Sequence, residues 1–187
     1  MGESLDIIEK VDSDDRFGST GQILPATGRK DFKAWQKSVQ SLLRTLHRPR
    51  YVATGLLPEM QQLDGRHAFI KNHQVPPYEK PEWKGDGTDE NPGMPMDEKL
   101  QIYAEAMAKD PAPFLEELNA KLIELDDLVF CENYCSEGGL SMDDIDLWSR
   151  LRSITLVKNV RWPTKLRSYM DNLSSLGDVP LYDEMAL

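Results

Sequence analysis

Hydrophobic residues recur every three or four positions along most of the chain, the spacing that places side chains on one face of an α-helix. The clearest long stripe runs from residue 27 to residue 54, and its apolar members are Phe32, Trp35, Val39, Leu42, Leu43 and Leu46. Pro49 is expected to kink or end this helix, because proline has no N–H to donate. No segment alternates between hydrophobic and polar residues as a half-buried strand does, so the pattern predicts an all-α body of about six or seven helices.

The most regular helix is predicted after Asp110, a capping residue that is followed by a proline suited to the first helical turn. Its apolar residues repeat at intervals of three and four: Leu115, Leu118, Leu122, Leu125 and Val129. Shorter stripes predict further helices at residues 3–12, after Pro58, at 96–109, at 142–157 and after Trp162.

The segment from Leu140 to Ile145 carries a helix-capping signal. Ser141 at the N-cap and Asp144 three residues later can satisfy each other's free backbone donors, an aspartate variant of the capping box. Leu140 and Ile145 can form the accompanying hydrophobic staple. Ser141 and Asp144 are therefore predicted to be the structural cap of an apolar central helix.

Two stretches have no helical pattern. Residues 16–28 form a polar, glycine-containing linker by composition. Residues 75–96 hold five prolines and three glycines, which excludes a regular element there. We expect the second stretch to be an insertion, part of which packs on the body through Tyr78 and Trp83.

Composition and charge narrow the possible functions. The 187 residues are 40% hydrophobic, with no apolar run of 18 and no secretory signal, so a cytoplasmic globular protein is expected. The net charge of −10 disfavours binding to nucleic acids or anionic membranes. Basic residues nevertheless gather in 29–50 and 147–170. These two segments either pack beside acidic helices or form an anion-binding groove.

Few residues suggest chemistry. The sequence has no phosphate-binding loop, no nucleophile elbow and no metalloprotease motif. The histidines are His47, His67 and His73, and their polar contexts predict surface positions. Cys131 and Cys135 lack a second Cys or His pair, so no metal site is predicted. Free, partly buried thiols are expected, with a regulatory disulfide as the alternative.

Glu3 and Ser4 stand at the start of a predicted helix. A helix N-terminus favours an anion, and an adjacent carboxylate can accept hydrogen bonds from an ammonium group. The pair can therefore hold the amino-acid end of a zwitterion, although an ordinary N-cap is the alternative that the residues leave open.

The chain resembles the glutaredoxin-2 family, the glutaredoxins with a glutathione-transferase-like architecture. The resemblance rests on Gly2–Ile8, on Arg48–Tyr51 and above all on the 33 residues from Leu140 to Asn172. It implies a glutathione-transferase C-terminal-like helical domain at residues 29–187 that includes the insertion at 75–96. It also implies that residues 1–15 are the remnant last helix of a thioredoxin-like domain, joined to the helical domain by the linker at 16–28.

Members of this family reduce protein disulfides and glutathione mixed disulfides with a Cys-Pro-Tyr-Cys motif in the thioredoxin-like domain. The sequence does not contain that motif, so an N-terminally truncated protein with no catalytic residue is expected, and its enzymatic status stays open. The resemblance places the γ-glutamyl end of glutathione on Glu3 and Ser4, with weak or no binding in this chain. Glutathione and disulfide substrates would be partners of the intact protein. The alternative is a non-enzymatic helical binding module.

Overall fold

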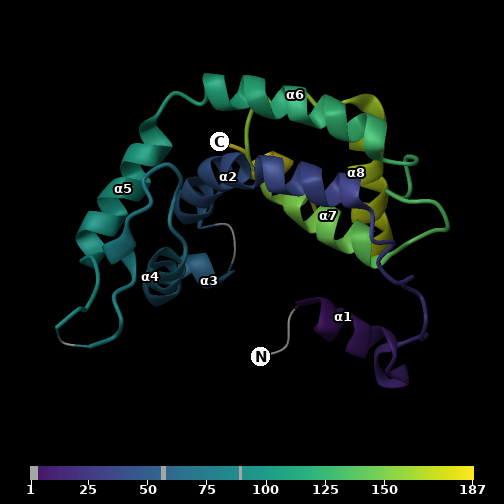
Figure 1. The fold of residues 1–187 in the computed structure, drawn as a ribbon, viewed down its shortest axis with the longest axis horizontal. Coiled ribbons are helices and arrows are strands. Elements are labelled where there is room, and N and C mark those ends of the chain that lie inside the picture. The colour runs from purple at the N-terminus through teal and green to yellow at the C-terminus, as the bar shows by residue number, and fades with distance from the viewer. Residues whose placement is uncertain (1–3, 56–57, 89) are drawn as a thin grey trace. The chain divides into compact units, whose positions relative to one another are not determined.

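The structure, a computed structural model, describes residues 4–55, 58–88 and 90–187, and only the backbone of residues 4, 5, 58 and 59. Within these ranges the chain folds into α-helices and short 3-10 helices (Figure 1). The one strand-like pairing among the described residues is an isolated parallel bridge between Leu24 and Ser141. The predicted all-α fold is confirmed.

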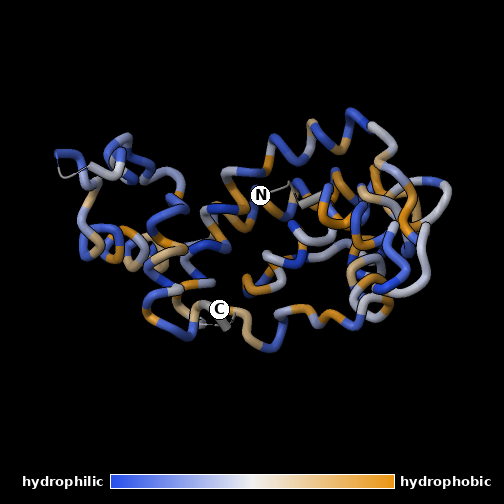
Figure 2. The backbone as a smooth tube through the Cα atoms, turned by 90° about the horizontal axis from the view of Figure 1, so that it is seen from below, coloured by the Kyte–Doolittle hydropathy of each residue, from blue (hydrophilic) through white to orange (hydrophobic). Residues whose placement is uncertain are grey.

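The α-helices of the described residues are α1 (Ser4–Asp12), α2 (Lys30–Thr54), α3 (Pro58–Gln61), α4 (Leu63–Asn72), α5 (Met96–Ala108), α6 (Ala112–Leu128), α7 (Met142–Ile154) and α8 (Thr164–Gly177). Three short 3-10 helices are η1 (Asp15–Phe17), η2 (Pro81–Trp83) and η3 (Asp183–Met185). Helices α2 to α8 form the body that the hydrophobic pattern predicts. Figure 2 shows hydrophobic and hydrophilic residues alternating along their turns. Within the described part of the chain, no helix has the length and hydropathy needed to cross a membrane.

Helix α2 differs from its prediction at Pro49, which lies inside the helix and does not end it. The helix continues beyond the proline, and the next residue, Arg50, binds two carbonyls: its Nη1 donates to the Leu46 carbonyl at 2.7 Å, and its Nε donates to the Leu187 carbonyl at 3.0 Å. The buried guanidinium thus binds a helical carbonyl next to the proline. The buried apolar stripe of α2, from Phe32 to Leu46, lies before Pro49, and its burial outweighs the hydrogen bond that proline cannot make.

By packing, the chain divides into two compact units. Unit 1 comprises the residues up to Trp35 with Leu122–Arg152 and Trp162–Leu181, and unit 2 comprises Gln36–Lys121, Ser153–Arg161 and Tyr182–Leu187. The domain boundaries expected after residues 15 and 28 stay predictions.

The core of unit 1 is built from α6, α7 and α8. Its fully or nearly fully buried side chains include Leu122, Leu125, Leu147, Leu151, Leu166, Tyr169 and Met170. The N-terminus of α8 follows Pro163, which has no side-chain acceptor, and Asp126 of α6 supplies one by accepting from the Leu166 N–H at 2.8 Å. Trp148 of α7 donates its Nε1–H to the Met170 carbonyl of α8 at 3.1 Å.

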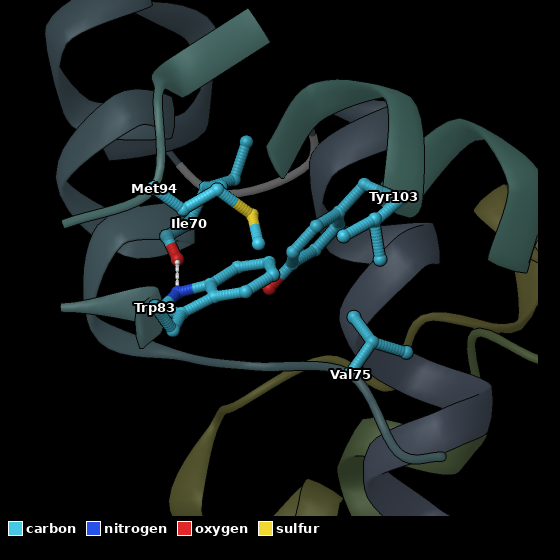
Figure 3. Close-up of a cluster of buried hydrophobic side chains, with 6 residues drawn as sticks. Ile70, Val75, Trp83, Met94 and Tyr103 are labelled. Carbon is cyan, nitrogen blue, oxygen red and sulfur yellow. Dashed lines mark hydrogen bonds between the residues drawn. The ribbon is translucent and has the colours of Figure 1, made fainter. Parts of the chain in front are cut away.

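The core of unit 2 is centred on Trp83 of the proline-rich segment. Figure 3 shows its indole among Ile70, Val75, Met94 and Tyr103, with the Nε1–H donating to the Ile70 carbonyl at 2.9 Å. Trp83 has no exposed surface, which confirms that this segment packs on the body. The segment stays irregular apart from η2, as its prolines and glycines predict.

His47 in unit 2 corrects the expectation of a surface position. Its side chain is partly buried, its ring lies 5.1 Å from that of Tyr51, and Nδ1 lies 3.3 Å from the Ser153 hydroxyl. Burial, reinforced by the positive charge of Arg48, lowers the pKa of His47 to about 3. Tyr51, one turn further along α2, and Ser153 contact this ring, and the polar residues beside His47 in the sequence do not reveal these contacts.

Candidate functional site

The start of α7 in unit 1 is organised by a buried carboxylate. Asp144 is completely buried, and its two oxygens accept four hydrogen bonds. Oδ1 accepts from the Cys135 N–H at 2.6 Å and from the Tyr169 hydroxyl at 3.2 Å. Oδ2 accepts from the Ser141 N–H at 2.9 Å and from the Ser141 hydroxyl at 2.7 Å. Asp144 therefore joins the turn before α7, the N-cap and α8.

Ser141 and Asp144 come together at the N-terminus of α7, where the sequence places them. Asp144 reaches back to the Ser141 N–H, which is half of a capping box. The Ser141 hydroxyl donates to the Asp144 carboxylate, whereas in a standard box it would accept from the N3 backbone N–H. The serine thus adds a second hydrogen bond to the buried charge.

The segment before α2 is bound to the same region. Leu24 pairs with the chain on both sides of Ser141: its N–H donates to the Leu140 carbonyl at 2.8 Å, and its carbonyl accepts from the Met142 N–H at 2.9 Å. The Thr27 N–H and hydroxyl both donate to Asp143. These contacts hold residues 24–27 of the predicted linker against the start of α7, and we call this ordered segment the strap.

Arg29 extends the strap toward the turn after α6. Its guanidinium donates to the Cys135 carbonyl and to the Leu128 carbonyl, each at 2.9 Å, and forms an ion pair with Asp31. The guanidinium carbon also lies 3.9 Å from the centre of the Phe32 ring. Sequence reasoning missed Arg29, Thr27 and Tyr169, because their partners lie 25 to 116 residues away along the chain.

The hydrogen bonds around Asp144 hold the thiol of Cys135 and the hydroxyl of Tyr169 in place, but neither group is reactive. Burial, with the nearby charge of Asp144, raises the pKa of the Cys135 thiol to about 12, so it is not a thiolate near neutral pH. Burial likewise raises the pKa of the Tyr169 hydroxyl above its ordinary value, so this group stays a hydrogen-bond donor. Both cysteines are free, with Cys131 partly exposed.

Two apolar pockets flank the start of α7, and Ile145 lines both. The first, of about 300 Å³, lies between α7 and the end of α8, and its other walls are Leu140, Asp144, Trp148, Leu173, Leu176, Gly177 and Val179. The second, of about 400 Å³, is bounded by α1, η1 and the following loop through Ile7, Ile8, Val11, Asp12, Phe17, Ser19, Gln22 and Ile23. Ile145 therefore lies between the two apolar pockets of unit 1.

The predicted glutathione residues lie at the edge of what is described. Ser4 is the first residue of α1, but its side chain and the whole of Glu3 fall outside the described residues. In the described part of α1, Ile7 and Val11 are 57% and 43% exposed. No cluster of three or more His, Cys, Asp or Glu side chains suited to a metal ion occurs in the described residues.

Comparison with known proteins shows which family this arrangement is similar to. Residues 95–186 match the family model described as glutaredoxin 2, C-terminal domain. Glutaredoxin 2 from Escherichia coli (strain K12) is 27% identical over 188 residues, covering all of this chain and 73% of the relative, and the protein of E. coli O157:H7 gives the same values. The crystal structure of glutaredoxin 2 from Salmonella typhimurium in complex with glutathione matches with a TM-score of 0.69 and 26% identity, over all of this chain and 72% of that one.

The class of protein that the fold defines is therefore the all-helical, glutathione-transferase-like domain, here with a short helix before it. Within that class the family model, the curated relatives and the crystal structure all support the glutaredoxin-2 family, which confirms the resemblance carried by Leu140–Asn172.

Proposed function

We propose that this chain is the helical part of a glutathione-dependent thiol-disulfide oxidoreductase that reduces protein disulfides and glutathione mixed disulfides. The observation that carries the proposal is the match of the whole chain to a glutaredoxin 2 structure that contains glutathione. Glutaredoxin 2 proteins of E. coli, aligned over the whole of this chain, support it further. The cytoplasmic location expected from the sequence stays a prediction.

The nucleophilic cysteine of the reaction is supplied, in this proposal, by a thioredoxin-like domain outside these 187 residues. The reaction needs a thiolate that attacks one sulfur of the disulfide while the other sulfur leaves as a thiolate. Cys135 does not meet this need, because its buried thiol has a pKa of about 12. The sequence holds one other cysteine, Cys131, and no Cys-Pro-Tyr-Cys motif.

The apolar face of α1 is the surface that we assign to contact with that domain. Ile7, Val11 and the neighbouring Phe17 are 57%, 43% and 65% exposed, which is unusual for three large apolar side chains in one short segment. The chain spans 73% of the length of its E. coli relatives, so these relatives have a further part that α1 can pack against.

Glutathione binding is proposed for Glu3 and Ser4. The γ-glutamyl group carries a carboxylate and an ammonium group. The N-terminus of α1, which begins at Ser4, favours the carboxylate, and the Glu3 carboxylate can accept from the ammonium. A chain that supplies only this half of the contacts is expected to bind glutathione weakly.

Thermal unfolding in a glutathione titration tests the assignment. A ligand that binds only the folded state raises the melting temperature, by an amount that grows with the ligand concentration relative to its Kd. The unmodified chain should show a small rise in millimolar glutathione, and Glu3→Gln with Ser4→Ala should abolish it. Glu9→Gln, which removes an exposed carboxylate from the same helix, should leave it unchanged. A flat response of the unmodified chain would remove Glu3 and Ser4 as binding residues.

A mixed-disulfide reductase assay tests the oxidoreductase proposal itself. The chain alone should show background activity, with or without Cys131→Ser. Addition of the part of E. coli glutaredoxin 2 that this chain does not cover should give more activity than that part has alone. Robust turnover by the chain alone that Cys131→Ser abolishes would contradict the proposal.

A further inference from the structure

A cavity of unit 2 has walls of apolar side chains, hydroxyl groups and one carboxylate. It has a volume of about 210 Å³ and lies between α2, the proline-rich segment and the first turns of α6. The residues that line it are Ser38, Ser41, Leu42, Thr45, Pro76, Pro77, Phe114 and Glu117. Glu117 is the one charged residue among them, so the walls carry a negative charge.

The polar groups of the walls are mainly hydrogen-bond acceptors. Pro76 and Pro77 have no backbone N–H, and the polar side chains that line the cavity end in hydroxyl or carboxylate oxygens. Glu117 is exposed, and within the part of the chain that the structure describes it forms no ion pair. The carboxylate is therefore available to a positively charged ligand.

The cavity is formed before a ligand arrives. The Thr45 hydroxyl donates to the Pro76 carbonyl at 2.9 Å, which holds the proline-rich segment against α2. Leu42 of α2 is buried, and so is Leu118, the residue after Glu117 on α6. Since the core fixes both helices, little conformational freedom is lost when a ligand binds between them.

The aromatic wall of the cavity already attracts a cation of the chain itself. The Lys109 ammonium lies 5.5 Å from the centre of the Phe114 ring and 5.8 Å from the centre of the Tyr78 ring. A cation within about 6 Å of an aromatic ring is attracted by the negative face of the ring. Lys109 does not line the cavity, so its ammonium shows the affinity of Phe114 for a cation without filling the space beside it.

We propose that this cavity binds the ammonium group of a small organic cation, with Glu117 as the counter-ion and the Phe114 ring as the cation–π partner. Leu42, Pro76 and Pro77 add apolar contacts. Apolar walls beside a carboxylate favour a methylated ammonium, whose charge is spread over methyl groups and whose transfer from water is less costly than that of a bare ammonium. The ligand class is therefore a short-chain quaternary ammonium compound.

The size of the cavity and the charges around it limit the ligand and its affinity. A cavity of about 210 Å³ is smaller than most pockets for drug-sized molecules and fits one ammonium group with a short chain. The charges of Lys109 and of Arg44 and Arg48 on α2 oppose a cation, although none of these residues lines the cavity. We therefore expect a Kd of about 1 mM. No cysteine and neither predicted glutathione residue lines the cavity, so this site does not depend on the proposed oxidoreductase function.

An NMR titration of the full chain with choline chloride tests the proposal, with sodium chloride holding the ionic strength constant. The amide signals of Ser41, Phe114 and Glu117 should shift and saturate. Dimethylbutanol, the uncharged analogue in which carbon replaces the nitrogen of choline, should bind at least fivefold more weakly, because it lacks the charge that Glu117 and Phe114 attract. Absence of saturable shifts with choline, or equal affinity for the two probes, would overturn the proposal.

Two charge substitutions should change the affinity for choline in opposite directions. Glu117→Gln should weaken binding about fivefold, the effect of losing one exposed ion pair. Its matched control is Glu116→Gln, which removes the neighbouring exposed carboxylate of α6 and should leave the affinity unchanged, because Glu116 does not line the cavity. Equal weakening by the two variants would overturn the proposal, since it would show only general attraction between charges.

Lys109→Gln gives a test that loss of folding cannot imitate, because it should tighten choline binding by removing the cation that competes for the Phe114 ring. Lys158→Gln removes an exposed lysine from another segment of unit 2 and should leave the affinity unchanged. Weaker binding by Lys109→Gln, or equal tightening by the two lysine variants, would contradict the assignment of Phe114 as the cation–π partner.

Discussion

The two units of this protein are built around opposite kinds of residue. The centre of unit 1 is Asp144, a carboxylate with no exposed surface that accepts four hydrogen bonds. The centre of unit 2 is Trp83, equally buried, which donates one hydrogen bond and packs among apolar side chains, with the Lys99 ammonium 5.6 Å from the centre of its ring. Both side chains are buried, but Asp144 acts through hydrogen bonds, whereas Trp83 acts mainly through apolar contacts.

The difference predicts how each unit responds to change. A buried carboxylate stabilises a fold only while its donors stay in place, so unit 1 depends on the geometry of Cys135, Ser141 and Tyr169. Apolar contacts scale with area and tolerate replacement by side chains of similar volume. The stability of unit 1 should therefore depend on which polar groups are present, and the stability of unit 2 should depend on side-chain volume.

Removal of the carboxylate is the largest expected effect. Asp144→Ala leaves two backbone N–H groups and two hydroxyls without their acceptor in a buried place, which should cost about 5 kcal/mol of the free energy of unfolding. Urea unfolding followed by circular dichroism measures this change. The result should include loss of the ordered strap, seen as faster amide exchange at Leu24 and Met142, whose N–H groups bond across the strap.

Asp146→Ala is the matched control for Asp144→Ala, because it removes a carboxylate from the same helix. Asp146 is partly exposed and pairs with Arg150 at 2.9 Å, one turn later. An ion pair of that kind is worth only about 0.5 kcal/mol. Similar losses in the two variants would contradict the assignment of Asp144 as the organising group of unit 1.

Truncation of the indole is the next largest effect. Trp83→Ala should cost about 4 kcal/mol, because it removes a large buried side chain and leaves a cavity among Ile70, Met94 and Tyr103. Trp83→Phe keeps most of the volume and should cost clearly less, as expected for a unit that depends on volume. Leu63→Ala, at a residue 59% exposed in the same unit, should change stability little. Equal losses for the alanine and phenylalanine variants would show that the hydrogen bond to Ile70 matters more than packing.

Sequence reasoning succeeded where the signal was local and periodic. The buried face of α2, from Phe32 to Leu46, follows from the hydrophobic spacing alone, and the position of Ser141 next to Asp144 follows from a separation of three residues. The sequence left open whether Pro49 kinks or ends the helix, and α2 does not end there. The Arg50 contact with the Leu187 carbonyl, 137 residues away, could not be predicted from a local pattern. No local signal marks Arg29 as a partner of the Cys135 carbonyl, or Tyr169 as a partner of Asp144.

The smallest expected effect concerns His47 of unit 2 and the dependence of stability on pH. Unit 1 buries the charged carboxylate of Asp144, whereas the imidazole of His47 in unit 2 stays uncharged, because burial lowers its pKa to about 3. The Arg50 guanidinium is nevertheless buried in unit 2. The unfolded chain, in which a histidine has a pKa of about 6.5, therefore binds a proton below that pH that the folded chain does not bind. Above about pH 6.5 this proton uptake has no effect on the free energy of unfolding. As the pH falls below 6.5 the free energy of unfolding decreases, by about 2 kcal/mol at pH 5. His47→Gln should reduce the difference between the free energies of unfolding at pH 8 and pH 5 by this amount, as measured by urea unfolding. An unchanged pH dependence in His47→Gln would mean that the imidazole is charged in the folded protein, and the contrast between the two units would then fail at this residue.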